Sequence, residues 1–261
     1  MVNISEGRDA LVIQELAQAV GRDLLDIHSD PDHNRSVFTM VGEDAPRNLA
    51  ESALSMMSIA NHDGVHPRIG MIDVVPFVPL KNSTMSDAIR ARNEFAQWAS
   101  HELGIPCFFY GPERTLPEIR KHSWTRLSPD TGPDAPHDTA GAMCVGAREP
   151  LVAYNVWLRD VNLTETKRIA SLVRCTEIRT LGLQVGRYTQ VSMNLIAPDI
   201  AGPFEAVRAV KQHVDIDRTE LVGLLPEDVL RRIPIDQWEA LDLSEDRTIE
   251  WRLEHRRSAT N

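Results

Sequence analysis

Apolar positions recur with two different periods along the chain. Ile13, Leu16, Ala17 and Val20 follow the i, i+3, i+4, i+7 spacing of an amphipathic helix, and Gly21 ends it. Residues 24–27 and 37–41 are instead short apolar runs, typical of buried strands, and a polar turn separates them. The opening of the chain therefore predicts a helix followed by a pair of strands.

The same rhythm continues to residue 110. Residues 46–60 predict a helix, 69–78 a buried strand and 106–110 a further short strand. Thr84 and Asp87 have the spacing of a capping box, and the apolar stripe that follows predicts a long helix. Residues 111–141 lose this periodicity, so we expect them to connect two subdomains and to cover a ligand.

The second half of the chain repeats this order of elements. Each half reads β-α-β-β-α-β, which favours an α+β fold of two ferredoxin-like subdomains over a doubly wound sheet. We place these subdomains at 1–140, which includes the connecting loop, and at 141–261. The predicted strands of the second half are 143–145, 151–157, 178–185, 190–196, 220–225 and 248–253, and its predicted helices are 162–173, one that starts at Pro203, and 226–233.

The stretch 61–80 has the composition of a site. A polar turn that contains His66, Asp63 and Arg68 lies beside Pro67 and leads directly into the apolar run 69–78. Histidine titrates near neutral pH, and rigid backbone on either side can hold its ring in one orientation. The turn is therefore a candidate site of proton transfer.

The overall composition argues against some classes of binding partner. A formal net charge of −10 argues against a binder of nucleic acid or of anionic membranes, because phosphate contacts need a surplus of Lys and Arg. Three cysteines without metal-binding spacing favour reduced thiols and a cytoplasmic setting. No apolar run is long enough for a membrane span, so we expect neither a signal peptide nor a membrane segment.

Several ordered segments carry a resemblance to a known family. They include Asn3-Ile-Ser-Glu-Gly-Arg8, Asn34-Arg35-Ser36-Val37, Gly64-Val-His-Pro-Arg-Ile-Gly70, Gly146-Ala-Arg148, Gln190-Val-Ser-Met-Asn-Leu195 and Glu220-Leu-Val-Gly-Leu-Leu-Pro226. Together they resemble the formiminotransferases, the folate-dependent enzymes of histidine degradation, in the form without a cyclodeaminase domain. The family fold, two ferredoxin-like subdomains with a ligand cleft between them, agrees with the pattern of elements.

The resemblance implies transfer of a formimino (or formyl) one-carbon group between an amino acid, by default glutamate, and N5 of tetrahydrofolate. His66 matches the catalytic histidine of the family. One imidazole can accept the proton of N5 and then protonate the departing amine, which typically contributes about 10²–10⁴-fold in rate. Tetrahydrofolate is then the one-carbon carrier, and neither a metal nor a covalent nucleophile is needed. A homodimer is expected from the resemblance alone.

The resemblance also assigns groups that bind the substrates. Arg35 and Arg148 are expected to pair with carboxylates, and the loop 130–141 is expected near the pteridine. The implied binding residues are Asn34, Arg35, Asp130, Gly132, Pro133, Gly141, Arg148 and Asn155.

Three positions near the expected cleft depart from the family pattern. Val65 stands where a Glu usually precedes the catalytic histidine, His28 replaces an acidic residue, and Trp157 replaces an Asn. Two alternatives therefore stay open. One is the same scaffold acting on a different amine in specialised metabolism, and the other is a non-catalytic folate-binding protein.

The candidate residues also have purely structural interpretations. Without the resemblance, a histidine beside a proline such as His66 is more often a surface or capping residue. Asp73 lies in an apolar run, where an ion pair with Arg68 explains it at least as well as catalysis. Asn34 and Arg35 can hold a ligand carboxylate or simply fix their own turn.

A metal site is the less favoured interpretation of the histidines. His62 and His66 share an H-x-x-x-H spacing, which places two ligands on one face only in a helix. Gly64 and Pro67 disfavour a helix there, so we expect no metal.

Overall fold

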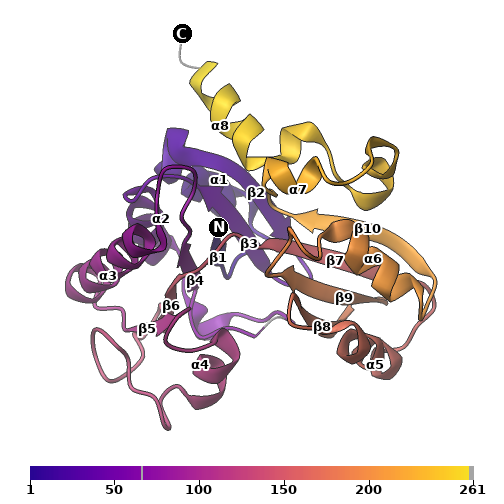
Figure 1. Cartoon of the computed structure of the whole chain (residues 1–261). Coiled ribbons are helices and arrows are strands. Elements are labelled where there is room, and N and C mark those ends of the chain that lie inside the picture. The colour runs from indigo at the N-terminus through magenta and orange to yellow at the C-terminus, as the bar shows by residue number, and fades with distance from the viewer. Residues whose placement is uncertain (66, 259–261) are drawn as a thin grey trace. The chain divides into compact units, whose positions relative to one another are not determined.

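The computed structural model describes residues 1–65 and 67–258, and the chain divides into two compact units (Figure 1). The first unit is Met1–Glu149 and the second is Pro150–Asn261. Each unit has its own β-sheet and its own hydrophobic core. Because both units combine a sheet with helices packed on it, the predicted α+β class is confirmed.

A mixed sheet organises the first unit. Its strands are β1 (Val2–Ile4), β2 (Leu24–Asp30), β3 (Arg35–Met40), β4 (Ile72–Phe77), β5 (Cys107–Tyr110) and β6 (Met143–Ala147). They form a 6-stranded sheet in the order β2-β3-β1-β4-β6-β5. Strands β2, β3, β1 and β4 pair antiparallel with one another, whereas β6 runs parallel to both β4 and β5.

A β-bulge interrupts the pairing of β1 with β4. Asn3 pairs with Val74, but the next residue, Ile4, pairs with Ile72. Asp73 is therefore the extra residue of the bulge, and its side chain is released from the regular alternation of the strand. Ile4 also pairs with Ser36 of β3, so Ser36 and Ile72 lie on either side of Ile4, and Arg35 and Asp73 are their neighbours in the chain.

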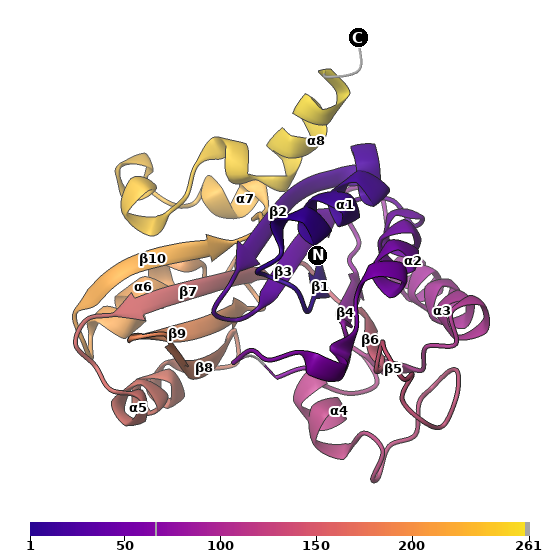
Figure 2. The ribbon, with the colours of Figure 1, turned by 180° about the vertical axis from the view of Figure 1, so that it is seen from behind.

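Three long helices pack on this sheet and share one core with it. They are α1 (Ala10–Val20), α2 (Ala45–Met56) and α3 (Met85–Glu102), and Figures 1 and 2 show them from opposite sides. Phe38 of β3 and Phe95 of α3 are fully buried, and burying such a ring contributes roughly 1.5–3 kcal/mol to stability. The predicted capping box is confirmed, because the Thr84 and Asp87 side chains each accept a hydrogen bond from the other residue's backbone N–H.

The stretch 111–141 contains a helix that the apolar pattern did not predict. Helix α4 (Leu116–His122) begins with a capping box between Thr115 and Glu118. Its Ile119 is fully buried against Val74 and Phe108, in a separate small core of the first unit. The helix is too short for a periodic stripe, so its capping residues were the available sequence signal.

The second unit contains a smaller, entirely antiparallel sheet. Its strands are β7 (Val152–Leu158), β8 (Ile178–Val185), β9 (Tyr188–Leu195) and β10 (Ile216–Val222). They form a 4-stranded sheet in the order β10-β7-β9-β8. Helices α5 (Leu163–Val173) and α6 (Pro203–Lys211) contribute to its core (Figure 2).

The C-terminal part of the second unit is helical. It contains the helices α7 (Glu227–Leu230) and α8 (Ile249–Ser258). Short 3-10 helices occur here at Ile235–Gln237, Glu239–Leu241 and Glu245–Arg247. The first unit has 3-10 helices at Gly21–Asp23 and Ile59–Asn61. The predicted strand at 248–253 is wrong, because α8 begins at Ile249. The Thr248 hydroxyl accepts a hydrogen bond from the Trp251 N–H at 3.3 Å, and such a capping contact favours a helix despite the alternating pattern. Within the described ranges, none of the helices combines the length and apolar character that crossing a membrane requires.

Candidate functional site

The turn that leads into β4 lies in the first unit. It follows the 3-10 helix Ile59–Asn61, and His66 within it lies outside the described residues. Val65, one residue before His66, is 47% exposed. The contacts that hold the turn are made by residues that precede and follow position 66 in the sequence.

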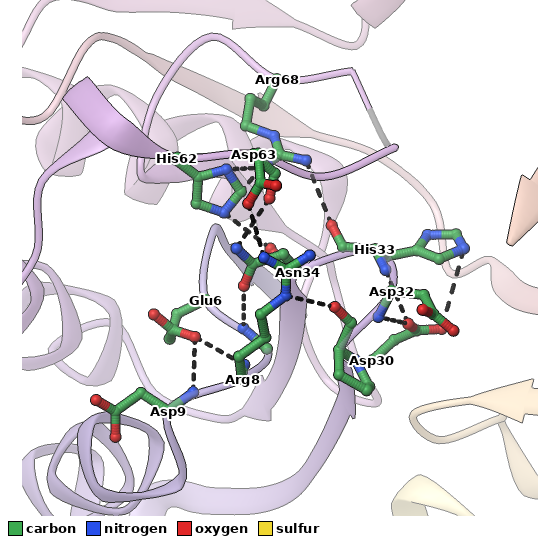
Figure 3. Close-up of polar contacts among 12 residues, drawn as sticks. Glu6, Arg8, Asp9, Asp30, Asp32, His33, Asn34, His62, Asp63 and Arg68 are labelled. Atoms are coloured by element: carbon green, nitrogen blue, oxygen red, sulfur yellow. Dashed lines mark hydrogen bonds and ion pairs between the residues drawn. The ribbon is translucent and has the colours of Figure 1, made fainter. Parts of the chain in front are cut away.

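Asn34 fastens three segments of the first unit together (Figure 3). Its Oδ1 accepts a hydrogen bond from the Gly7 N–H at 3.0 Å, and its Nδ2 donates to the Asp63 carbonyl oxygen at 2.9 Å. Asn34 is buried and has a φ of 46°, a left-handed conformation that Asn tolerates better than most residues. Because both ends of its amide bind the protein, Asn34 builds the turn.

His62 and Arg68 are paired above Asn34 (Figure 3). The Arg68 guanidinium lies against the His62 ring, and His62 Nε2 is 3.0 Å from the Asn34 carbonyl oxygen. Burial, followed by the charge of Arg68, lowers the pKa of His62. A neutral ring can donate from Nε2 to that carbonyl oxygen while Nδ1 accepts from Arg68.

Arg68 also reaches across the turn to the preceding loop. Its Nη2 donates to the His33 carbonyl oxygen at 3.3 Å. A Cβ at Gly64 would lie 2.4 Å from that oxygen and 2.5 Å from Arg68 Nη2. Glycine at position 64 is therefore required for this contact.

Arg8 closes the outer side of the same network. It donates to the Pro31 carbonyl oxygen at 2.8 Å and to Asp63 Oδ1 at 2.7 Å (Figure 3). The hydrogen bond and the charge of Arg8 lower the pKa of Asp63. Asp63 is exposed, so this pair contributes little to stability and mainly orients the turn.

A second group of charges lies beside the turn, around Asp73. Asp73 is buried; its Oδ1 accepts from the Ile69 N–H at 2.8 Å and its Oδ2 from Arg120 Nη2 at 2.6 Å. We expected Arg68 as its ion-pair partner, but the direct partner is Arg120 of α4. Burial lowers the pKa of Arg35, the charge of Asp73 opposes that shift, and the charges of Arg120 and Arg68 add to it.

Asp130, which we expected to contact folate, holds the loop 130–141 against β5. The Asp130 carboxylate accepts from both terminal nitrogens of Arg114, at 2.7 and 2.9 Å, and from the Phe109 N–H at 2.7 Å. Its hydrogen bonds therefore fix the start of the loop. Gly132 has a φ of 91°, and Pro133 is exposed.

The end of this loop lies directly against the turn. Gly141 and Gly70 form an antiparallel bridge, and the Ile59 N–H donates to the Thr139 carbonyl oxygen at 2.7 Å. Gly141 has a φ of 71°, and a Cβ there would lie 2.4 Å from the Ile69 carbonyl oxygen. Two regions that the sequence marked separately are thus joined through close backbone contact.

Arg148 lies at the end of β6, next to Tyr110 of β5. Burial lowers the pKa of Arg148, and the Tyr110 phenol partly opposes that shift. Burial raises the pKa of Tyr110 to about 12. Arg148 also donates to the Glu149 carbonyl oxygen at 2.9 Å.

Asn155 belongs to the second unit, where it shares a carboxylate with Trp157. Asn155 Nδ2 and Trp157 Nε1 donate to Glu220 Oε2 at 3.0 and 2.9 Å. The Arg218 guanidinium stacks on the Trp157 ring, 4.0 Å from its centroid. The indole that departs from the family pattern is therefore held by both a hydrogen bond and a cation–π contact.

The first unit thus brings together Asn34, Arg35 and the turn that contains position 66, with Gly141 at its edge. Sequence reasoning missed Arg120, because α4 was not expected, and it missed Arg8 as a contact of the turn. In the part of the chain that the structure describes, no group of three His, Cys, Asp or Glu side chains could hold a metal ion. His28 lies half-buried on β2.

Comparison with known proteins identifies a family for this chain. A family model described as the formiminotransferase domain, N-terminal subdomain, matches residues 1–148. A glutamate formimidoyltransferase of Streptococcus pyogenes is 34% identical over 87% of this chain and 88% of its own length. The enzyme of the same name from Thermoplasma acidophilum gives the same values. A formimidoyltransferase-cyclodeaminase of Sus scrofa is 30% identical over 86% of this chain but only 49% of its own length.

Proposed function

Because the chain belongs to the formiminotransferase family, we propose that it transfers a formimino group from N-formiminoglutamate to N5 of tetrahydrofolate. The observation that carries this proposal is the match to glutamate formimidoyltransferases over nearly their whole length. The products are glutamate and 5-formiminotetrahydrofolate, so tetrahydrofolate is a substrate that carries the one-carbon unit. Formyl transfer on the same scaffold is the variant of this reaction that the sequence left open.

The reaction requires one bond to form, one to break and one proton to move. N5 attacks the amidine carbon and loses its proton, the bond from that carbon to the glutamate nitrogen breaks, and this nitrogen gains a proton. We assign both proton transfers to His66, with a contribution of about 10²–10⁴-fold. The network of Asn34, His62 and Arg68 supports this role, since it fixes the backbone on both sides of position 66.

The remaining binding residues follow the same reasoning. We assign Arg35 and Arg148 to carboxylates of the substrates, and the loop from Asp130 through Gly132 and Pro133 to Gly141 to the neighbourhood of the pteridine. The backbone contact between Gly70 and Gly141 supports this, because it fastens that loop to the turn. Asn34 and Asn155 are proposed as further binding positions.

We also propose that both units are ferredoxin-like subdomains. The order β10-β7-β9-β8 and the corresponding part β2-β3-β1-β4 of the first sheet support the topology. The predicted division at 140/141 stays a proposal, and the pairing of β6 in the first sheet favours a boundary after that strand. A homodimer and a cytoplasmic location are likewise proposed from the family, without nucleic acid, membrane or metal as partners.

The test replaces the proposed proton carrier. His66→Ala should reduce formimino transfer by at least about 10²-fold, while its thermal unfolding stays that of the wild type. His101→Ala is the matched control, since His101 is exposed on α3, and it should retain full turnover. Mass spectrometry of the N5-modified folate measures the product, and near-normal turnover of His66→Ala would refute the assignment.

The same assay separates the alternative functions. Turnover of another formimino donor, but not of formiminoglutamate, would favour a different amine substrate. Tight binding of tetrahydrofolate without any product would favour a folate-binding protein, and absence of folate binding would contradict all of these functions.

A further inference from the structure

Three arginines lie around Asp73 in the first unit. Arg35 comes from the start of β3, Arg68 from the turn and Arg120 from α4. Arg120 is ion-paired with Asp73 at 2.6 Å. Burial lowers the pKa of Arg35, the charge of Asp73 opposes that shift, and the charges of Arg120 and Arg68 add to it. Segments far apart in the sequence thus concentrate positive charge at one place.

Asp73 is already occupied by other groups. Its Oδ2 is in an ion pair with Arg120 at 2.6 Å, and its Oδ1 accepts from the Ile69 N–H at 2.8 Å. Arg68, for its part, binds the His62 ring and the His33 carbonyl oxygen. The direct contacts of Asp73 therefore hold Arg120 and the turn, and they do not include Arg35.

Arg35 has a buried donor that none of the described residues satisfies. Across residues 1–65 and 67–258, its Nε has no hydrogen-bond partner and is shielded from solvent, and the same is true of Arg120 Nε. Burial outweighs the nearby carboxylate and lowers the pKa of Arg35 to about 10. A buried guanidinium N–H without a hydrogen-bond partner is costly, and an anion that accepts from it would remove that cost.

The residues still leave access for such an anion. Arg35 is only partly buried as a whole residue, and the Arg120 side chain is 18% exposed. The planar guanidinium fork matches the two oxygens of a carboxylate. The cluster is therefore built to receive an external carboxylate.

We propose that Arg35, Arg68 and Arg120 form the binding site for a carboxylate of the amino-acid substrate, with Arg120 held in place by Asp73. This inference rests on the proposed function. In formiminoglutamate the carboxylates lie only a few bonds from the nitrogen that reacts, whereas in folate they lie beyond the aminobenzoyl ring. Arg68 is two positions from His66, and Arg35 adjoins the residue that holds the turn, so the cluster suits the short substrate.

Direct binding of a minimal ligand tests the site without catalysis. Glutarate carries the two carboxylates of the substrate but no amidine, and isothermal titration calorimetry measures its Kd. Arg35→Gln and Arg120→Gln should each weaken binding by about 10-fold or more, since charge-assisted hydrogen bonds are lost. Arg90→Gln, which changes an exposed ion pair of α3, should bind glutarate as the wild type does.

Steady-state kinetics then identifies the substrate that the site serves. In both cluster variants the KM for formiminoglutamate should rise by about 10-fold or more, with the KM for tetrahydrofolate unchanged. Arg120→Lys keeps the charge and the pairing with Asp73, so it should keep the fold and show a smaller rise than Arg120→Gln. Thermal unfolding of each variant excludes a loss caused by misfolding.

The outcomes distinguish failure of this inference from failure of the proposed function. Three results would each overturn the carboxylate site. They are no detectable glutarate binding by the wild type, equal glutarate binding by the wild type and the variants, and a rise in the KM for tetrahydrofolate alone. Arginine-dependent glutarate binding in a protein that does not turn over formiminoglutamate would instead support the carboxylate site and contradict the proposed reaction.

Discussion

Asn34 and Arg35 are neighbours in the sequence, yet the structure uses them in opposite ways. The Asn34 amide binds Gly7 and Asp63 and thereby joins three segments of the first unit. Arg35 Nε is buried without a partner within the described residues, beside two further arginines. One residue thus builds the site and the other is left able to bind. A satisfied polar group is explained by the fold, whereas a buried unsatisfied one needs a further explanation, which for Arg35 is the proposed carboxylate.

The largest effect is expected from Gly7→Ala, which disturbs both residues at once. A Cβ at Gly7 would lie 2.3 Å from the Asp30 carbonyl oxygen and 2.5 Å from the Arg35 backbone nitrogen. Because backbone atoms cannot move aside cheaply, we expect a loss of at least about 3 kcal/mol in the free energy of unfolding. Urea denaturation measures it.

Gly21→Ala is the matched control for that substitution. Gly21 has a φ of 62°, but a Cβ there would meet nothing within 4 Å. Gly21→Ala should lower the free energy of unfolding by only about 1–2 kcal/mol, because alanine is strained in the left-handed backbone conformation. Equal losses for both variants would show that the close approach at Gly7 is unimportant.

A smaller effect separates the two neighbours themselves. Asn34→Ala should cost about 2–3 kcal/mol of unfolding free energy, because one buried and one partly buried hydrogen bond are lost at a positive φ. Arg35→Gln should change it by no more than about 0.5 kcal/mol, or stabilise the protein, because it removes a buried charge whose Nε has no partner among the described residues. Urea unfolding of the two variants side by side is the measurement. A large loss from Arg35→Gln would mean that Arg35, too, is a structural residue.

The smallest effect is the contribution of His62 to the pH dependence of the free energy of unfolding. The pKa of His62 is lowered from its ordinary 6.5, so the folded state favours the neutral ring. As the pH falls below about 6.5, His62 takes up a proton in the unfolded state before it does so in the folded state. The free energy of unfolding therefore falls until the pH is below the pKa of His62 in the folded protein. His62 is only partly buried, so solvent screening limits the loss to below about 1 kcal/mol.

Unfolding free energies at pH 7.5 and at pH 5.5 test this link. His62→Gln should remove this part of the pH dependence, whereas His101→Gln, on the exposed face of α3, should retain it. An identical pH dependence in the wild type and His62→Gln would exclude His62 as the titrating group.

Local sequence signals determined most elements of the fold. Gly21 ends α1, the Thr84–Asp87 box starts α3, and the Asn162 side chain caps α5 by accepting from the Glu165 N–H at 3.0 Å. These signals are local because a cap involves residues only a few positions apart. Where the signal was short, as for α4, or where alternation competed with a cap, as for α8, the pattern did not predict the element.

The sequence also identified the turn, the loop 130–141 and Arg35, but only the tertiary structure assigned their contacts. It pairs Asp73 with Arg120 across 47 positions, and it bonds Asn34 to Gly7 and Asp63. Such partners depend on strand register, a β-bulge and the packing of α4, which arise from interactions between distant segments. A hydrogen-bond donor left unsatisfied by all of them, as on Arg35, is a property of the folded chain that no local pattern encodes.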